Sequence, residues 1–379
     1  MNPADVRELF PILKERTYLF SGGHSPASTP ALEAVQRLMG EWAGDTGDLY
    51  GRLHEEQDEV RRLFAGLIGA DVDEVAVLDS TGSGENLAVE MIPVPAHGNV
   101  VFDEWSYPSA VYPWMLPPRD HIERRWVMSR VGVIALDDLA RAIDDETVAV
   151  SISHVTQGEG FRQDLGAVSK LAHAHGALLL VDAAQSAGAV RIDVHAQGID
   201  FLSAGACKWL LGAAGMAFFY AARPHMQDMP PHAGAPSAAN EFTSPSKGPF
   251  VPKVGAERFH LGIPNLLGLA ATRPGLTALT ETGMERVEAH VLGLSGRCIT
   301  GLRERGIDVL TPDDPKKRGG VVAAVVDDAP AIEKFMRERR IDVYGGHTYN
   351  RTLRIDPHVF NEDDDVDRLL AALDEYQAG

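Results

Sequence analysis

Short apolar runs alternate along the first two thirds of the chain with segments whose apolar positions recur at helical spacing. Apolar runs bounded by polar or glycine-rich turns are typical of strands buried on both faces. The pattern predicts strands at residues 75–78, 100–102, 148–153, 178–181, 201–204 and 216–220, and helices at 85–91 and around 171–175. Such strand–helix alternation predicts an α/β fold with helices on both faces of a largely parallel sheet.

The pattern changes after residue 223. Residues 223–254 are rich in Pro, Ser and Gly, which predicts a long surface loop between two domains. Beyond it, the spacing predicts helices over 266–283 and 284–305, strands at 307–310 and 320–326, a helix from 331, a strand at 353–355 and a last helix from 362. We therefore expect an N-terminal segment (1–15), a large domain (16–254) and a smaller α+β domain (255–379).

The composition fits an ordinary soluble protein and argues against two classes of partner. Of the 379 residues, 45% are hydrophobic and 23% are charged. The formal net charge of −19 disfavours nucleic acid and anionic membranes, because both require a basic face. We see no membrane span, signal peptide or metal-type cysteine pair, since Cys207 and Cys298 lie far apart in the sequence. We expect a cytoplasmic protein without a metal site.

One acid and one lysine each lie near the end of a predicted strand. Asp182 ends the apolar run 178–181, and Lys208 follows the run 201–204 after a turn of small residues. Their spacing fits a crossover between neighbouring parallel strands, which would bring both to the carboxyl edge of the sheet, where ligands bind. A lysine amine can form an imine with the aldehyde of pyridoxal 5'-phosphate (PLP), and a carboxylate can pair with its pyridine nitrogen. A single strand-end lysine is more often structural, so the interpretation depends on the pair together with nearby Gln185.

The segment 178–211 resembles the class V aminotransferase and cysteine desulfurase superfamily of fold-type I PLP-dependent enzymes, which includes isopenicillin N epimerase-like proteins and kynureninase. The likeness extends from about Tyr18 to Tyr376. It implies a large domain with a mixed, mostly parallel sheet, a smaller α+β C-terminal domain and a homodimer. It also implies a Schiff base between Lys208 and PLP, with Asp182 as a catalytic partner of the ring nitrogen.

The resemblance also assigns contacts to the cofactor. Thr81, Gly82 and Ser83 match the phosphate-binding turn, although such a turn can be a plain helix cap. Tyr107 matches the aromatic residue that stacks on the cofactor ring, and Trp105 is its competitor for that role. Gln185 matches the residue that bonds to the phenolic oxygen. His154 matches a cofactor-facing position and is a predicted catalytic residue. Core packing is the alternative for the two aromatic rings, and a structural role is the alternative for His154.

The sequence departs from the desulfurase pattern before the lysine. Gly205, Ala206 and Cys207 stand where desulfurases carry Ser-x-His, which removes a phosphate ligand and leaves Ser203 as a candidate replacement. Cys207 itself is interpreted as a small packing residue rather than a catalytic thiol.

On the substrate side, residues 352–358 resemble the segment whose arginine pairs with the substrate α-carboxylate, which makes Arg354 the predicted ligand. Gln157 and His347 are predicted to contact the substrate, and loops around 20–54, 157–162 and 228–250 to build the rest of the pocket. The stretch 344–350 lacks the cysteine that desulfurases carry there. We therefore predict an enzyme that is not a persulfide-forming cysteine desulfurase.

The sequence leaves the reaction open. The leading hypothesis is β-elimination or related C–S cleavage of an S-substituted cysteine or similar amino acid, because the frame is desulfurase-like but lacks the desulfurase thiol. Transamination between an amino acid and a 2-oxo acid is the next hypothesis, followed by epimerisation. A non-catalytic PLP-binding protein is the alternative from a different class.

Overall fold

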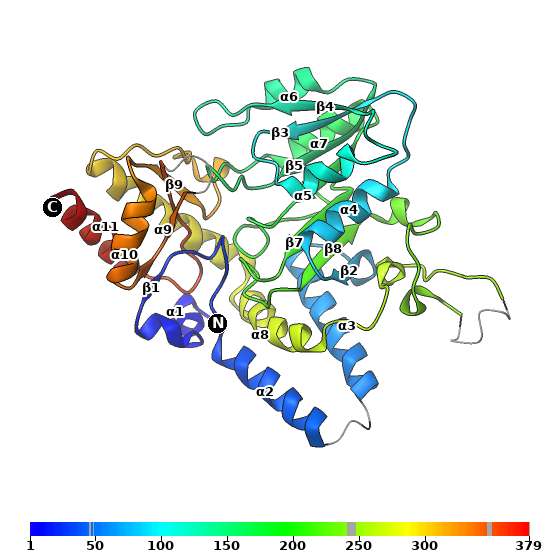
Figure 1. Ribbon diagram of the computed structural model, residues 1–379, viewed down its shortest axis with the longest axis horizontal. Helices are drawn as coiled ribbons and strands as arrows, with labels where there is room; N and C mark the ends of the chain where they lie inside the picture. Colours follow the sequence, from blue (N-terminus) through cyan, green and yellow to red (C-terminus); the bar gives the residue numbers. More distant parts are fainter. Residues whose placement is uncertain (45–46, 48, 241–247, 347–350, 379) are drawn as a thin grey trace.

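The centre of the fold is a seven-stranded sheet of order β2-β8-β7-β6-β5-β3-β4 (Figure 1). The computed structural model describes residues 1–44, 47, 49–240, 248–346 and 351–378. The strands are β2 (Val75–Leu78), β3 (Asn99–Asp103), β4 (Glu123–Val127), β5 (Thr147–Ser153), β6 (Leu178–Asp182), β7 (Phe201–Gly205) and β8 (Ala217–Ala221). β8 runs antiparallel to β2 and β7, and the remaining pairs are parallel. The predicted α/β fold with a mixed, mostly parallel sheet is confirmed.

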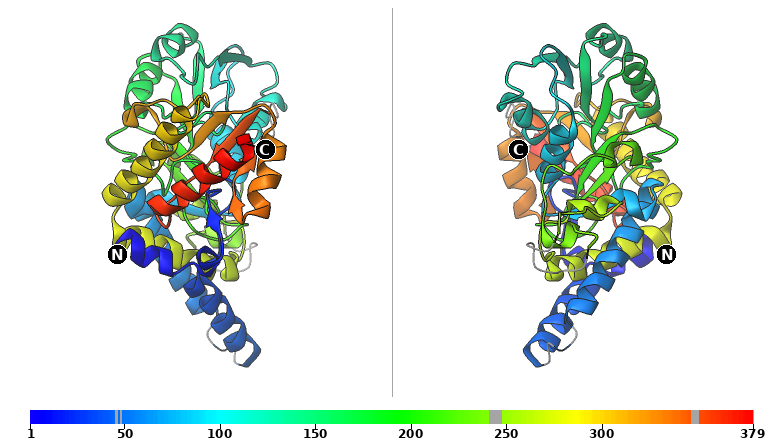
Figure 2. Two further views of the ribbon diagram at one scale, coloured as in Figure 1. Left: turned by 90° about the vertical axis from the view of Figure 1, so that its left-hand side faces the viewer. Right: turned by 90° about the vertical axis from the view of Figure 1, so that its right-hand side faces the viewer.

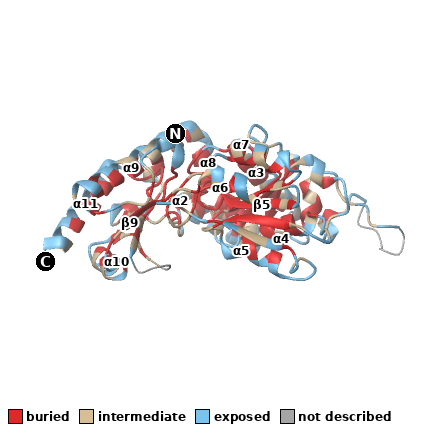
Figure 3. Cartoon of the chain, turned by 90° about the horizontal axis from the view of Figure 1, so that it is seen from above, coloured by how far each residue is buried: buried red, intermediate tan, exposed pale blue. Residues whose placement is uncertain are grey.

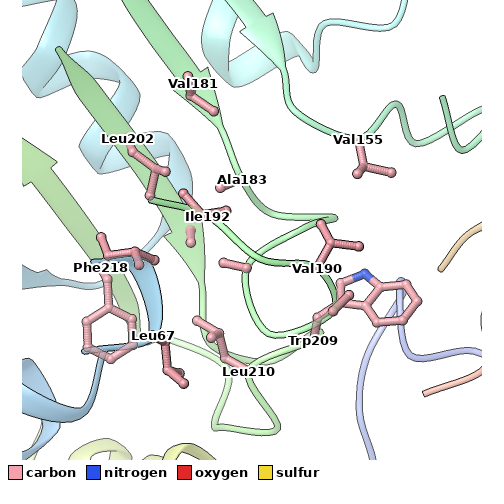
Figure 4. Close-up of a cluster of buried hydrophobic side chains, with 14 of the residues drawn as sticks. Leu67, Val155, Val181, Ala183, Val190, Ile192, Leu202, Trp209, Leu210 and Phe218 are labelled. Atoms are coloured by element: carbon pink, nitrogen blue, oxygen red, sulfur yellow. The ribbon is translucent and has the colours of Figure 1, made fainter. Parts of the chain in front are cut away.

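One face of this sheet carries the larger core. Val181 and Phe218 pack there with residues of α3 (Leu49–Ile68) and α7 (Leu165–Ala174). Trp209 belongs to the same core, and Figure 4 shows it near the chain that follows β6. The residue after Lys208 is therefore anchored in the protein interior.

The opposite face is equally buried, because successive side chains of a strand point to opposite sides. Leu180 and Phe219, which alternate with the residues of the first face, pack with α4 (Thr81–Met91). Figure 3 shows the buried strands lying between helices whose outer faces are exposed. The remaining helices near this sheet are α5 (Pro108–Val111) and α6 (Leu136–Ala142).

A second, three-stranded antiparallel sheet of order β11-β12-β9 lies in the C-terminal part of the chain. Its elements are β9 (Val322–Val325), β11 (Tyr344–Gly345), β12 (Thr352–Ile355), α9 (Met284–Glu304), α10 (Ala329–Glu338) and α11 (Asp363–Ala378). The predicted strand at 307–310 is wrong, since only an isolated bridge joins Val309 to Ala324. The predicted domain boundaries at 15 and 254 stay predictions.

The N-terminal region joins the two parts. β1 (Thr17–Tyr18) pairs in parallel with β10 (Ile341–Asp342). The other helices are α1 (Pro3–Glu8), α2 (Thr29–Gly44) and α8 (Leu266–Thr282). The expected pocket loops around 20–54 are limited to the residues before 29, because most of the remainder lies in α2 and α3, whose adjoining ends project from the molecule (Figure 2). None of the helices in the described part of the chain is long and apolar enough to cross a membrane.

Candidate active site

Two adjoining cavities lie at the carboxyl ends of the central strands, where ligand sites form in α/β sheets. The inner chamber has a volume of about 280 Å³ and includes Asp182 at the end of β6. The outer chamber has a volume of about 410 Å³ and includes Arg354 of β12. Five residues line both chambers: Trp105, Tyr107, Gln157, Gln185 and Lys208. Lys208 therefore lies where the two chambers meet.

Lys208 is held in place by the loop that follows β1. The Ser25 hydroxyl donates to the Lys208 carbonyl oxygen (2.6 Å), and the Ser25 backbone N–H donates to the Cys207 carbonyl oxygen (2.7 Å). Burial lowers the pKa of the Lys208 amine, while the Asp182 carboxylate acts in the opposite direction. A lowered pKa favours the neutral amine, which is the form that attacks a carbonyl carbon or accepts a proton.

Asp182 supplies a buried carboxyl group to the inner chamber. Its Oδ1 accepts a hydrogen bond from the backbone N–H of Ala184 (2.8 Å). Burial raises the pKa of Asp182, and the Ala184 hydrogen bond and the Lys208 charge oppose that rise. A cationic group bound in the chamber would further favour the ionised carboxylate.

The beginning of α4 forms the other end of the inner chamber. Thr81 and Gly82 line it from the first turn, and Ser109 lies beside them, with its Cβ 3.3 Å from where a Cβ on Gly82 would stand. A helix N-terminus offers free backbone N–H groups and a positive dipole end, which together favour an anion. This end of the chamber fits a phosphate group. Ser109 was not predicted, although it follows Tyr107 by only two residues.

Two predicted phosphate ligands do not line the inner chamber. The Ser83 hydroxyl bonds to Ser80 Oγ (2.9 Å) and to the Asp79 carboxylate, and Ser83 lines a neighbouring cavity. Ser203 donates from its Oγ to the Thr81 carbonyl oxygen (2.9 Å). Ser203 thus fixes the beginning of α4 against β7 instead of facing the chamber.

Gly205, which replaces a side-chain ligand of the desulfurase pattern, leaves room for Thr81. A Cβ at position 205 would stand 3.0 Å from Thr81 Oγ1. A larger residue there would press on a hydroxyl that lines the inner chamber. Glycine at position 205 therefore leaves room for Thr81 beside β7.

Both aromatic candidates lie in the site. Tyr107 is 48% exposed, and the Lys208 Nζ lies 5.8 Å from its ring centroid. Trp105 packs so closely on Gly158 that a Cβ there would stand 2.1 Å from the ring. Either ring can offer a face to a flat ligand, for which stacking contributes about 1 kcal/mol.

Gln185 links the inner chamber to two distant segments. Its Nε2 donates to the Gly22 carbonyl oxygen (2.9 Å), and its Oε1 accepts from Trp209 Nε1 (2.9 Å). An amide nitrogen carries two hydrogens, so one remains for a ligand in the chamber that Gln185 lines.

His154 is not among the residues that line either chamber. Ser153 and Val155 line the inner chamber, and side chains alternate along an extended chain, so His154 points the other way. Its Nε2 lies 3.3 Å from Arg162 Nε, and burial together with the Arg162 charge holds the His154 pKa well below its usual range. The structure therefore does not bring His154 together with Asp182 and Lys208 in a shared cavity.

Arg354 reaches the outer chamber while paired with a buried acid. Its Nε donates to Asp356 Oδ2 (2.8 Å), and its Nη2 lies 2.7 Å from the same oxygen. Its Nη1 lies 3.4 Å from the Gln157 carbonyl oxygen. Asp356 was not predicted, although it stands two residues after Arg354 and hence on the same side of an extended chain.

Aromatic rings border Arg354. Phe20 and Tyr344 stack with centroids 5.2 Å apart, and Arg354 Cζ lies 5.8 Å and 5.9 Å from the two centroids. Gly346 also lines the outer chamber. The next residue, His347, was predicted as a substrate contact and lies outside the described residues.

Among the described residues, one group has the composition of a metal site. Ligand atoms of Asp71, Glu74 and His195 lie within 4.8 Å of one another. His195 Nε2 and Glu74 Oε2 are 2.7 Å apart, and Arg223 Nη2 lies 2.7 Å from Asp71 Oδ2. Arg223 thus already supplies a positive charge to this group.

The donor set of the inner chamber fits PLP. The α4 turn suits the phosphate, Asp182 suits a protonated ring nitrogen, and Lys208 provides the amine. The outer chamber adds a guanidinium for a carboxylate.

Comparisons with known proteins agree with this arrangement. The family model for aminotransferase class-V matches residues 17–369. The uncharacterized aminotransferase YcbU of Bacillus subtilis (strain 168) is 28% identical, covering 99% of this chain and 98% of the relative. A probable cysteine desulfurase of Methanothermobacter thermautotrophicus is 24% identical, covering 99% and 98%. A solved complex between the cystine C-S lyase C-DES and its reaction product cysteine persulfide superposes with a TM-score of 0.87 at 21% identity, covering 96% of this chain and 98% of that one.

These relatives correct one prediction. The exclusion of a persulfide-forming cysteine desulfurase is wrong, because relatives named as cysteine desulfurases align over nearly the whole chain. The missing thiol in 344–350 therefore does not by itself exclude that activity. The predicted superfamily, and the PLP cofactor that it implies, are supported by the family match. Since that match spans nearly the full length, the chain belongs to the class-V aminotransferase family.

Proposed function

We propose that this chain is a PLP-dependent enzyme that cleaves the Cβ–S bond of an S-substituted cysteine or a similar amino acid. The position of Lys208 carries the proposal: its amine lies between a chamber that fits the cofactor and a chamber that contains Arg354. A protein of the same fold is described as a cystine C-S lyase, so the fold is compatible with this reaction.

Three residues have distinct tasks in this proposal. The bound cofactor supplies an electron sink for the substrate Cα. Arg354 binds the α-carboxylate through the guanidinium donors that Asp356 leaves available. Lys208 Nζ, as a neutral amine, accepts the proton from Cα. Asp182 would supply the carboxylate that pairs with a protonated ring nitrogen, because a cationic group in the chamber favours the ionised form.

The bond changes balance without an added oxidant. The Cα–H bond breaks and its proton moves to Lys208 Nζ, while the Cβ–S bond breaks and sulfur leaves with the bonding electrons. The proton returns to the departing sulfur, which gives a thiol. The remaining aminoacrylate takes up water and yields pyruvate and ammonia.

Transamination is the second candidate, because one relative is named an aminotransferase. That reaction would release a 2-oxo acid, with Arg354 holding the carboxylate and Lys208 moving the Cα proton as in the first candidate. Epimerisation and non-catalytic PLP binding are further outcomes that the same experiment separates.

The test is a panel of cystine, S-alkyl cysteines and alanine, each with and without a 2-oxo acid. Pyruvate and ammonia from an S-substituted cysteine without an acceptor are the expected result. Strict dependence on the 2-oxo acid would indicate transamination. Free cysteine, assayed as a further substrate with a thiol reductant, would give alanine and sulfide if the enzyme is a desulfurase. Racemised amino acid alone would indicate epimerisation, and no turnover of any substrate would favour a binding protein.

The proposal includes a homodimer in the cytoplasm. Leu261 and Ile263 are 54% and 68% exposed, and Leu261 lines the same cavity as Ser83 next to the α4 turn. Exposed apolar residues close to a binding site support a partner subunit there. Sedimentation equilibrium should give twice the mass of the chain, and a monomer at micromolar concentration would refute the dimer.

A further inference from the structure

The outer chamber has an aromatic wall beside Arg354. Arg354 and Asp356 stand two residues apart, so their side chains lie on the same side of the extended chain. Tyr344 of β11 is the antiparallel partner of Arg354, and Phe20 forms an isolated bridge with Asp356. Residues that are paired directly across neighbouring strands present their side chains on one face. The backbone therefore fixes both rings next to the guanidinium.

Glycines border this wall and keep the chamber open. Gly22 and Gly23 line the outer chamber together with Phe20. A Cβ at position 22 would stand 2.5 Å from Arg354 Nη2, and a Cβ at position 23 would overlap the Phe20 ring. The backbone thus packs directly on the groups of the wall. No side chain from these two positions occupies the chamber volume of about 410 Å³.

The charges of the outer chamber favour a neutral ligand group beyond the α-carboxylate. Over the residues that the structure describes, its lining includes two cations, Lys208 and Arg354, and no Asp or Glu. Both cations already have a task in the proposed function. An ammonium group would find no carboxylate in this lining, and a second carboxylate would find no further cation. Taking either charge out of water without a partner is unfavourable.

We propose that the sulfur of the substrate carries a flat, apolar group, which packs against the rings of Phe20 and Tyr344 while Arg354 holds the α-carboxylate. The sulfur rests on the proposed function, whereas the preference for a ring belongs to the chamber. Arg354 Cζ lies 5.8 Å and 5.9 Å from the two ring centroids, so both rings neighbour any carboxylate that Arg354 holds. Aromatic rings in contact gain energy beyond the area that they bury.

The first test measures binding and needs no turnover. Pentanoate, hexanedioate, 5-phenylpentanoate and 5-cyclohexylpentanoate carry no amine and cannot form an imine, so each is titrated into the PLP-loaded protein by calorimetry. The phenyl acid should bind about 10- to 100-fold more tightly than pentanoate, because it buries a ring. It should also bind more tightly than the cyclohexyl acid, which is of similar size but not flat. Hexanedioate should bind no more tightly than pentanoate.

Two results of these titrations would overturn the proposal. The first is equal affinity of the phenyl acid and either pentanoate or the cyclohexyl acid. The second is hexanedioate as the tightest ligand, which would show that the chamber accepts a second charge.

The second test removes one ring. Phe20→Leu keeps an apolar side chain, so the preference for 5-phenylpentanoate over pentanoate should fall roughly threefold or more. Phe335→Leu is the matched control, because Phe335 packs on Tyr376 with ring centroids 5.1 Å apart and lines neither chamber. Equal preferences in both variants and in wild type would contradict the role of the wall. If Phe20→Leu does not fold, Tyr344→Leu takes its place.

Turnover separates this inference from the proposed function. S-benzylcysteine should yield pyruvate with a higher kcat/KM than S-methylcysteine. An equal or higher kcat/KM for S-methylcysteine would overturn the inference and leave C–S cleavage standing. Tight binding of 5-phenylpentanoate without pyruvate from either cysteine derivative would refute C–S cleavage and leave the preference of the chamber standing.

Discussion

At the residue scale, the predicted substrate arginine is already held by a buried acid. Asp356 is 0% exposed and contacts two nitrogens of Arg354. Burial raises the pKa of Asp356, and Arg354 opposes that rise. This pairing fixes the guanidinium plane before any substrate binds, which reduces the entropy lost on binding. Specificity for a carboxylate then depends on the planar fork and not on charge alone.

Replacing Arg354 by lysine tests this dependence. Arg354→Lys keeps the charge but loses the fork, so KM for the amino acid should rise roughly 10- to 100-fold with a smaller change in kcat. Steady-state kinetics measure both. Arg351→Lys is the control, because Arg351 is exposed and pairs with Asp327 at the surface. An unchanged KM in Arg354→Lys would remove Arg354 from the carboxylate site.

The position of a residue in the site could be predicted from the sequence when the residue lies close to the end of a predicted strand. Asp182 ends β6, Lys208 comes three residues after the end of β7, and the two share the inner chamber. His154 could not be placed from the sequence, because a shift of one position reverses the direction of a side chain and the end of β5 is uncertain by about that much. Ser203 was misleading for another reason, since its hydroxyl bonds to the Thr81 carbonyl on an element distant in sequence.

At the element scale, α4 positions the phosphate end of the site. It begins at Thr81 because Ser80 caps it, with Ser80 Oγ accepting from the Ser83 N–H (3.1 Å). It packs on β7 without a gap, since a Cβ on Gly84 would stand 2.2 Å from Ser203 Oγ. Gly84 therefore sets how closely the helix approaches the sheet.

Gly84→Ala should push the helix away from β7. We expect a loss of roughly 1–3 kcal/mol in the free energy of unfolding, as for other overpacked sites, together with weaker PLP binding. Thermal unfolding and a cofactor titration provide the measurements. Gly66→Ala in α3 is the matched control, because a Cβ there has no neighbour within 4 Å and should stabilise the helix by up to about 1 kcal/mol. Equal stability of the Gly84 and Gly66 variants would contradict the packing argument.

Strands could be predicted from the sequence where their side chains are buried on both faces of the sheet. β6 and β7 are almost fully buried, and their sequences, LLLVD and FLSAG, are mostly apolar. β4 was missed because it is an edge strand with the sequence ERRWV and is largely exposed. The predicted strand at 307–310 has an apolar pattern, but β9 pairs there through a single isolated bridge.

At the scale of the whole molecule, one histidine connects the C-terminal part to the lysine loop. His358 is fully buried; its Nε2 donates to the Trp209 carbonyl oxygen (2.8 Å), and its Nδ1 accepts from the Val359 N–H (2.7 Å). Burial lowers the pKa of His358 to about 4. The folded state therefore holds this ring neutral.

This histidine makes stability depend on pH in a defined window. Between about pH 6.5 and pH 4 the unfolded chain binds a proton at position 358 and the folded chain does not, so stability falls as pH falls, by roughly 2–4 kcal/mol from this residue. In His358→Gln, urea unfolding should show a flatter pH dependence across that window. Two other buried groups also affect the pH dependence of stability: burial lowers the pKa of His260 to about 3 and raises that of Asp103, which acts in the opposite direction. Both are present in the variant and in the wild type, so their effects cancel in the comparison. Parallel profiles for variant and wild type would refute this contribution.

The proposed chemistry requires a covalent link between PLP and one amine. After reconstitution with PLP and reduction with borohydride, mass spectrometry of tryptic peptides should find the pyridoxyl phosphate addition on Lys208, and Lys208→Ala should abolish it. Lys170, on α7 outside both chambers, serves as an internal control and should remain unmodified. A Lys208 peptide of unmodified mass, or an addition on another lysine, would contradict the central claim.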